Sequence, residues 1–70
     1  MTPKQEELLK TIIDELEEEA KLRTVAAALE TRNTMQEEYR YLSDRANQHA
    51  ARWIKAVEEL TGKTLEELYQ

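Results

Sequence analysis

The chain has 70 residues, with 15 acidic and 10 basic side chains, a formal net charge of −5 and no cysteine, which excludes a disulfide framework and a cysteine-based zinc site. One glycine and one proline exclude a turn-rich all-β fold, and the length suits a single domain over residues 1–70. Because no apolar run approaches the ~20 residues of a membrane span and no signal-peptide pattern is present, we expect a cytoplasmic protein without membrane contact.

The first predicted element is a helix over residues 3–31. Thr2, Pro3 and Gln5 fit an N-cap, a first helical position and a capping-box partner. One apolar face follows at helical spacing: Leu9, Ile12, Ile13, Leu16, Ala20 and Ala27. A second stripe lies nearly opposite: Leu22, Val25, Ala26 and Leu29. One neighbouring helix covers only one of these stripes, so either the helix breaks near residues 20–24 or another surface covers the second stripe. Because no Gly or Pro marks a break, we favour another surface, which is a second hairpin or, as the alternative, a different protein.

The second predicted helix covers residues 34–61. Thr34 and Glu37 fit a capping box, and Gly62 fits a terminating residue. Steps of four and three form one heptad seam: Met35, Tyr39, Leu42, Ala46, His49, Trp53, Ala56 and Leu60. Asn33 favours a tight turn between the two helices, with one continuous helix as the alternative.

An antiparallel hairpin with its turn near Arg32 places Trp53 beside Ile12 and Ile13. The same register brings Glu17, Glu18 and Glu19 alongside Arg45 and Arg52. A third, short helix over residues 65–69, capped by Thr64, is expected to fold back over Val57 and Leu60 and to cover one end of the bundle.

A lone two-helix layer leaves much of its core open to water, so the fold class we predict is an all-α hairpin that dimerises into a four-helix bundle. Symmetric dimers are the commonest closed assembly, which favours a homodimer. The residues expected at the oligomer interface are Leu22, Val25, Leu29, Tyr39, Leu42, Ala46, His49 and Trp53.

Few residues point to chemistry. His49 is the sole histidine, and no second metal ligand lies three or four residues away, so we interpret it as a satisfied polar residue in the core or at the interface. Ser43 lies on a different side of the same predicted helix, which disfavours a nucleophile–base pair. Gly62-Lys63-Thr64 lacks the earlier glycine and the preceding strand of a P-loop. We therefore expect no enzyme activity, no cofactor and no metal site.

One polar face of the second predicted helix combines basic residues with an aromatic ring. It consists of Tyr41, Arg45, Gln48, Arg52 and Lys55. Such a face either pairs with the acidic residues of the first helix or grips phosphates and stacks on bases. In length class, acidity, hairpin layout and the early Thr2, Lys4 and Gln5, the chain resembles the Rop family of plasmid RNA-binding proteins. That resemblance implies a dimeric four-helix bundle that binds RNA, and it transfers no site residue.

We interpret the chain as a small acidic helical protein–protein interaction module without catalytic activity. As a homodimer it would bind or inhibit a larger protein, in the manner of phage or mobile-element regulators. The alternative interpretation is a Rop-like RNA-binding bundle that uses the basic face of the second helix.

Overall fold

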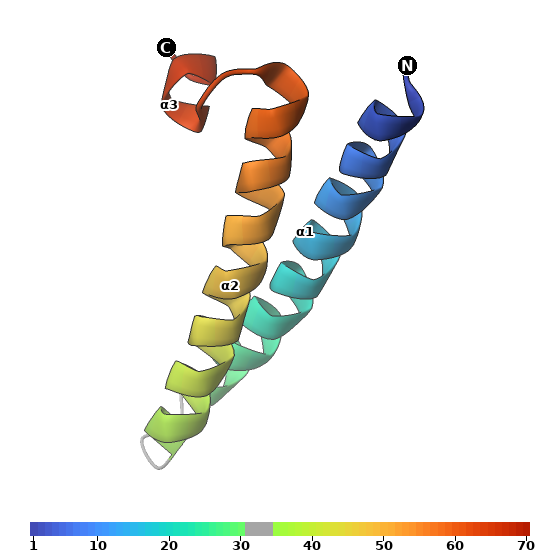
Figure 1. Cartoon of the computed structure of the whole chain (residues 1–70). Coiled ribbons are helices and arrows are strands. Elements are labelled where there is room, and N and C mark those ends of the chain that lie inside the picture. Colours follow the sequence, from blue (N-terminus) through green and yellow to red (C-terminus); the bar gives the residue numbers. More distant parts are fainter. Residues whose placement is uncertain (31–34) are drawn as a thin grey trace.

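The computed structural model describes residues 1–30 and 35–70, and it is an all-α hairpin with a short third helix (Figure 1). Helix α1 spans Pro3–Glu30, α2 spans Gln36–Thr61 and α3 spans Leu65–Leu68. Helices α1 and α2 pack against each other in antiparallel directions, which confirms the predicted hairpin and makes the continuous-helix alternative wrong. The predicted turn at Asn33 and the Thr34 cap lie outside the described residues, and α2 follows Met35 without a side-chain capping hydrogen bond.

Local capping chemistry explains where the remaining helix ends lie. The Thr2 backbone N–H donates to Gln5 Oε1 at 2.9 Å, and the Gln5 backbone N–H donates to Thr2 Oγ1 at 3.2 Å. Gly62 ends α2 in the left-handed region with φ 71°, and its N–H donates to the Glu58 carbonyl at 2.9 Å. Thr64 Oγ1 accepts from the Glu67 N–H at 3.2 Å. The first and third predicted capping boxes and the glycine terminator are therefore confirmed.

The interior of the hairpin is thin. Among the described residues the buried side chains are Ala26, Ala46 and Ala56, and no large side chain is fully buried. These alanines allow the backbones of α1 and α2 to approach closely, whereas the larger apolar residues reach only partial cover. The molecule measures 48 × 26 × 13 Å, and its thinnest dimension is close to the diameter of a single helix, about 10–12 Å. The hairpin is one layer of helices with one face of each helix covered.

The rotation of α1 differs from the prediction. Ile13 and Leu16 are 61% and 41% exposed, whereas Leu22 and Leu29 are half-buried on the side that carries Ala26. The first stripe was expected to face α2, but four of its six residues are exposed: Ile13, Leu16, Ala20 and Ala27. The second stripe was expected to need another surface, but all its residues except Val25 are buried or half-buried. Of the two residues predicted beside Trp53, Ile12 is half-buried and Ile13 is mostly exposed. The covered side of α1 also carries two glutamates, Glu15 and Glu19, which bond to His49 and Trp53 of α2.

Helix α3 contacts α2 and, within the described part of the chain, does not contact α1. Figure 1 shows it beside the last turns of α2, on the side away from α1. Val57, Leu60 and Leu65 are half-buried, and Leu68 is 40% exposed. The tail therefore packs on the end of α2, but it does not cover the seam between α1 and α2.

Candidate functional site

The centre of the seam contains a polar cluster that we call the interhelical polar network: Glu15, Glu19, His49 and Trp53. His49 Nδ1 hydrogen-bonds to Glu15 Oε2, and Trp53 Nε1–H donates to Glu19 Oε1 at 2.7 Å. The side chains of His49, Glu15 and Glu19 are 14%, 20% and 15% exposed. Polar groups this far from water need partners, and here each helix supplies the partners of the other.

The two bonds of the network cross the seam diagonally. In an antiparallel hairpin Glu15 and Trp53 lie farther from residues 31–34, and Glu19 and His49 lie nearer. Straight pairing would join Glu15 to Trp53, whereas the observed bonds join Glu15 to His49 and Glu19 to Trp53. Two bonds on opposite diagonals resist sliding of α1 along α2 in either direction. The network therefore fixes the register of the hairpin.

Two arginines extend the network toward solvent. Arg23 Nε donates to Glu19 Oε2 at 2.7 Å, and Arg23 Nη2 donates to Asn47 Oδ1 at 3.1 Å. Arg52 Nη1 lies 3.8 Å from Glu15 Oε2. Burial raises the pKa of Glu19, but the hydrogen bonds from Trp53 and Arg23 and the charges of Arg23 and His49 lower it more, so its pKa lies below the ordinary value of 4.5.

The sequence-based pairing of acidic and basic residues is only partly correct. Glu15, not the run from Glu17 to Glu19, lies beside Arg52. Glu17 and Glu18 instead pair with Lys21 of their own helix at 3.9 and 3.5 Å. Such exposed pairs within one helix contribute about 0.3–0.5 kcal/mol each. They solubilise the outside of α1 and do not join the helices.

The residues expected at an oligomer interface divide into two groups. Tyr39, Leu42, Ala46, His49 and Trp53 are buried or half-buried along α2, and Leu22 and Leu29 are half-buried along α1. Val25 differs, because it is 51% exposed on the outside of α1. His49, which was expected as a satisfied polar residue, has an intrachain partner in Glu15.

Sequence analysis missed the role of Glu15 and Glu19, which look like members of a solvated face. A usable signal does exist, since an unbroken pattern of steps of four and three passes through both glutamates. It consists of Leu8, Ile12, Glu15, Glu19, Leu22, Ala26 and Leu29. The seven residues of this pattern run along the side of α1 that faces α2, so the glutamates occupy seam positions opposite His49 and Trp53.

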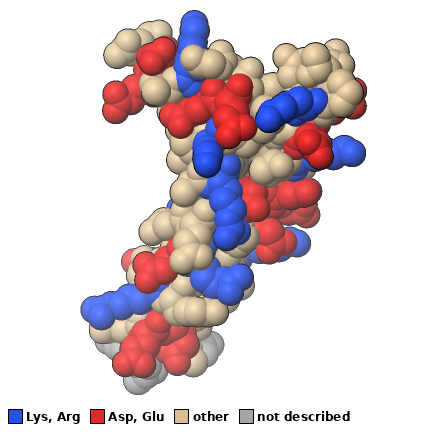
Figure 2. All heavy atoms as spheres, viewed as in Figure 1, with Lys and Arg blue, Asp and Glu red and all other residues tan. Residues whose placement is uncertain are grey.

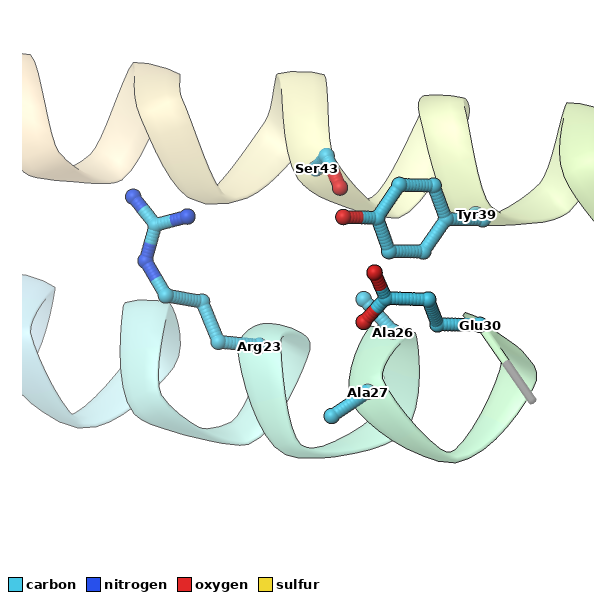
Figure 3. A pocket seen from close by; sticks show the side chains of 6 residues that line it. All are labelled: Arg23, Ala26, Ala27, Glu30, Tyr39 and Ser43. Carbon is cyan, nitrogen blue, oxygen red and sulfur yellow. The ribbon is translucent and has the colours of Figure 1, made fainter.

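One outer side of the layer carries a group of apolar side chains next to the Arg23–Asn47 pair, and we call this group the apolar face: Leu9, Ile13, Leu16 and Ala20 of α1 with Ala50 and Ile54 of α2. Two observations place these helix faces on one side of the layer. Arg23 bonds to Asn47, and a hollow of about 150 Å³ is lined from both helices near residues 31–34. Figure 3 shows Arg23, Ala27 and Glu30 of α1 and Tyr39 and Ser43 of α2 around that hollow. Helical spacing leads from Ala27 and Ser43 along this side to the apolar face.

The other outer side carries the predicted basic residues, and we call it the charged face: Tyr41, Arg45, Gln48, Arg52 and Lys55. Arg45 Nη1 donates to Tyr41 Oη at 3.3 Å, and its guanidinium carbon lies 5.9 Å from the Tyr41 ring centroid. Arg52 and Lys55 line an open hollow of about 300 Å³ together with Leu8, Thr11 and Glu59. Figure 2 shows Lys and Arg side chains in a column along α2, with many acidic side chains over α1.

Comparisons with known proteins give no relative: no protein-family model, no curated protein and no solved structure matches the chain significantly. Within residues 1–30 and 35–70, no group of three or more His, Asp or Glu side chains is arranged to hold a metal ion. None of the described helices is long and apolar enough to cross a membrane.

Proposed function

We propose that the protein is a non-catalytic helical interaction module, which acts as a homodimer and binds or inhibits a larger protein. The single observation that supports this proposal is the open hairpin: Ile13 and Leu16 are large apolar residues on the apolar face of α1 that are 61% and 41% exposed. Exposed apolar side chains gathered on one element are typical of surfaces that bind other proteins.

The placement of the reactive side chains agrees with a binding role. His49 Nδ1 is engaged by Glu15 in the middle of the seam. Ser43, the sole serine, lines the shallow hollow near Tyr39 and Glu30, on another side of α2. A nucleophile and its base must lie within hydrogen-bond reach in a substrate complex, and these two residues point to different sides of one helix.

A pull-down with the full tagged chain tests the protein-binding function. We expect a stoichiometric protein partner that remains bound after nuclease treatment. Because a homodimer that buries the apolar face leaves the charged face open to a partner, we also expect loss of that partner in an Arg45→Glu/Arg52→Glu variant. A Lys4→Glu/Lys10→Glu variant makes the same change of charge on exposed residues of α1 and should retain the partner. Capture that depends on nucleic acid would contradict this proposal.

A second function, RNA binding, is favoured by one specific observation on the charged face. Tyr41 is 60% exposed and lies under the Arg45 guanidinium, so an arginine and an aromatic ring are presented together to solvent. Binding of a structured RNA should then weaken steeply with salt, because phosphate contacts release counterions. Arg45→Ala/Arg52→Ala should abolish it, whereas Lys4→Ala/Lys10→Ala, which removes the same charge, should not. Equal losses in both variants would indicate non-specific attraction and would contradict this function.

A further inference from the structure

The accessible surface of the hairpin is larger than that of a compact chain of its size. A compact monomer of 8.2 kDa exposes about 4,500 Å², and this chain exposes 5542 Å². The excess is about 1,000 Å², close to the ~800 Å² that each partner buries in a standard protein interface. The radius of gyration is 14.8 Å, against about 11 Å for a compact 70-residue domain. A second layer of helices would bury the excess surface and would make the thin, elongated layer part of a thicker body.

The two outer sides of the layer differ in what they offer to that second layer. The apolar face presents Ile13 and Leu16 at 61% and 41% exposure, beside small Ala20 and half-buried Ile54. The charged face presents arginine and lysine side chains that are costly to remove from water. A helical layer therefore fits on the apolar face and leaves the charged face in solvent.

We propose that a second copy of this chain covers the apolar face, with the ends at residues 31–34 of the two hairpins at opposite ends of a four-helix bundle. The proposal rests on the homodimer of the proposed function and adds its face and its orientation. A two-fold axis that reverses the hairpins in this way lays α1 of one copy antiparallel over α1 of the other. Leu16, near the middle of α1, then lies close to the axis.

The distribution of side-chain sizes favours this orientation. The half of the apolar face toward Pro3 and Thr61 carries the large Leu9, Ile13 and Ile54. The other half carries Ala20, and small Ala27 and the Arg23–Asn47 pair lie beyond it on the same side of the layer. Opposed hairpins place the small half of each copy on the large half of the other, so that Ala20 faces the region of the second copy's Ile13. The same-direction arrangement would place large residues on large ones at one end and leave a void at the other.

Sedimentation equilibrium of the full chain tests the face. We expect wild-type protein at twice 8.2 kDa, and a rise of at least about 100-fold in the dimer Kd for Ile13→Lys, since each dimer contains the substitution twice. Val25→Lys is the matched control, because Val25 is 51% exposed on the other side of α1, and its Kd should change by less than about threefold. A monomeric wild-type chain, or dissociation by Val25→Lys instead of Ile13→Lys, overturns the proposal.

Single cysteines test the orientation without a large disturbance of folding, because the chain contains no cysteine of its own. Leu16→Cys should form a disulfide-linked dimer on mild oxidation. Ala27→Cys should not, since the two copies of position 27 would be about 30 Å apart and a disulfide needs Cα atoms within about 7 Å. Cross-linking by Ala27→Cys alone overturns the orientation. A dimer with these properties that captures no protein partner would overturn the protein-binding part of the proposed function and would leave the dimer inference standing. A monomer that captures a protein partner would overturn the dimer inference and would leave the protein-binding function standing.

Discussion

Helices α1 and α2 have nearly equal lengths, but they differ in the side chains that they turn toward each other. Helix α2 turns its apolar seam toward α1 and buries Ala46 and Ala56 there, with its charged residues outside. Helix α1 turns Glu15 and Glu19 inward to bond with α2 and leaves Ile13 and Leu16 outside. In this rotation Glu15 and Glu19 share the covered side of α1 with apolar residues such as Ile12 and Leu22, and the uncovered apolar surface lies mainly on α1.

The largest expected effect tests the close approach at the seam of α2. Ala46 is 0% exposed, so Ala46→Leu forces the helices apart and should lower the free energy of unfolding by about 1–3 kcal/mol. Thermal melts monitored by circular dichroism at one fixed protein concentration measure this change. Ala51→Leu adds the same side chain at an exposed position of α2 and should change stability by less than about 0.5 kcal/mol. Equal losses in both variants would mean that the seam is not tightly packed.

The next effect concerns the inward carboxylate of α1 and depends on pH. Glu19→Gln keeps the size of the side chain but removes the charge that accepts from Trp53 and Arg23, and it should cost about 1–2 kcal/mol at pH 7. Because the pKa of folded Glu19 is lowered, its charge stabilises the fold fully above the ordinary value of 4.5, and this stabilisation is lost as the pH falls through the folded pKa. The difference in Tm between wild type and Glu19→Gln should therefore shrink below pH 4.5.

Glu18→Gln is the control for that pH dependence. Glu18 is 52% exposed and pairs only with Lys21 at 3.5 Å among the described residues, so its substitution should hardly change Tm between pH 3 and pH 8. If the Tm difference between wild type and Glu19→Gln stayed constant from pH 3 to pH 8, the Glu19 side chain would stabilise the hairpin through its packing and not through its charge.

Sequence reasoning predicted the features that local chemistry determines. The seam of α2, the caps at Thr2 and Thr64 and the terminator at Gly62 depend on neighbouring residues, and the structure contains all of them. It did not predict the rotation of α1, because that helix has two apolar stripes of similar content. The structure pairs Glu15 with His49 and Glu19 with Trp53. The pattern from Leu8 to Leu29 passes through both glutamates, but the pattern alone does not show which residues of α2 accept them as partners. For the same reason the candidate apolar face contains Ile13 and Leu16 in place of Leu22 and Leu29.

A double-mutant cycle separates the inner and outer partners of Glu15. Coupling between Glu15→Ala and His49→Ala should be about 1 kcal/mol, because both side chains are shielded in the seam. Coupling between Glu15→Ala and Arg52→Ala should be below about 0.5 kcal/mol, because the Arg52 side chain is 57% exposed and lies 3.8 Å away. Chemical denaturation of the four variants of each cycle gives both values. A larger coupling with Arg52 would place the register-fixing contact at the surface of the hairpin.

The most local effect is expected at the end of α2, outside the contact between α1 and α2. Gly62 has φ 71°, and a Cβ built there meets nothing within 4 Å, so Gly62→Ala carries only the backbone cost of the left-handed conformation, about 1 kcal/mol. Gly62→Asn should cost less, since asparagine tolerates this conformation. For a domain of this size the alanine variant should melt about 4–8 °C lower at fixed concentration.

Amide exchange in the alanine variant should rise at Thr61–Tyr69 and stay unchanged at His49, because α3 contacts only the end of α2 among the described helices. Faster exchange along the seam would instead mean that the docking of α3 supports the whole hairpin.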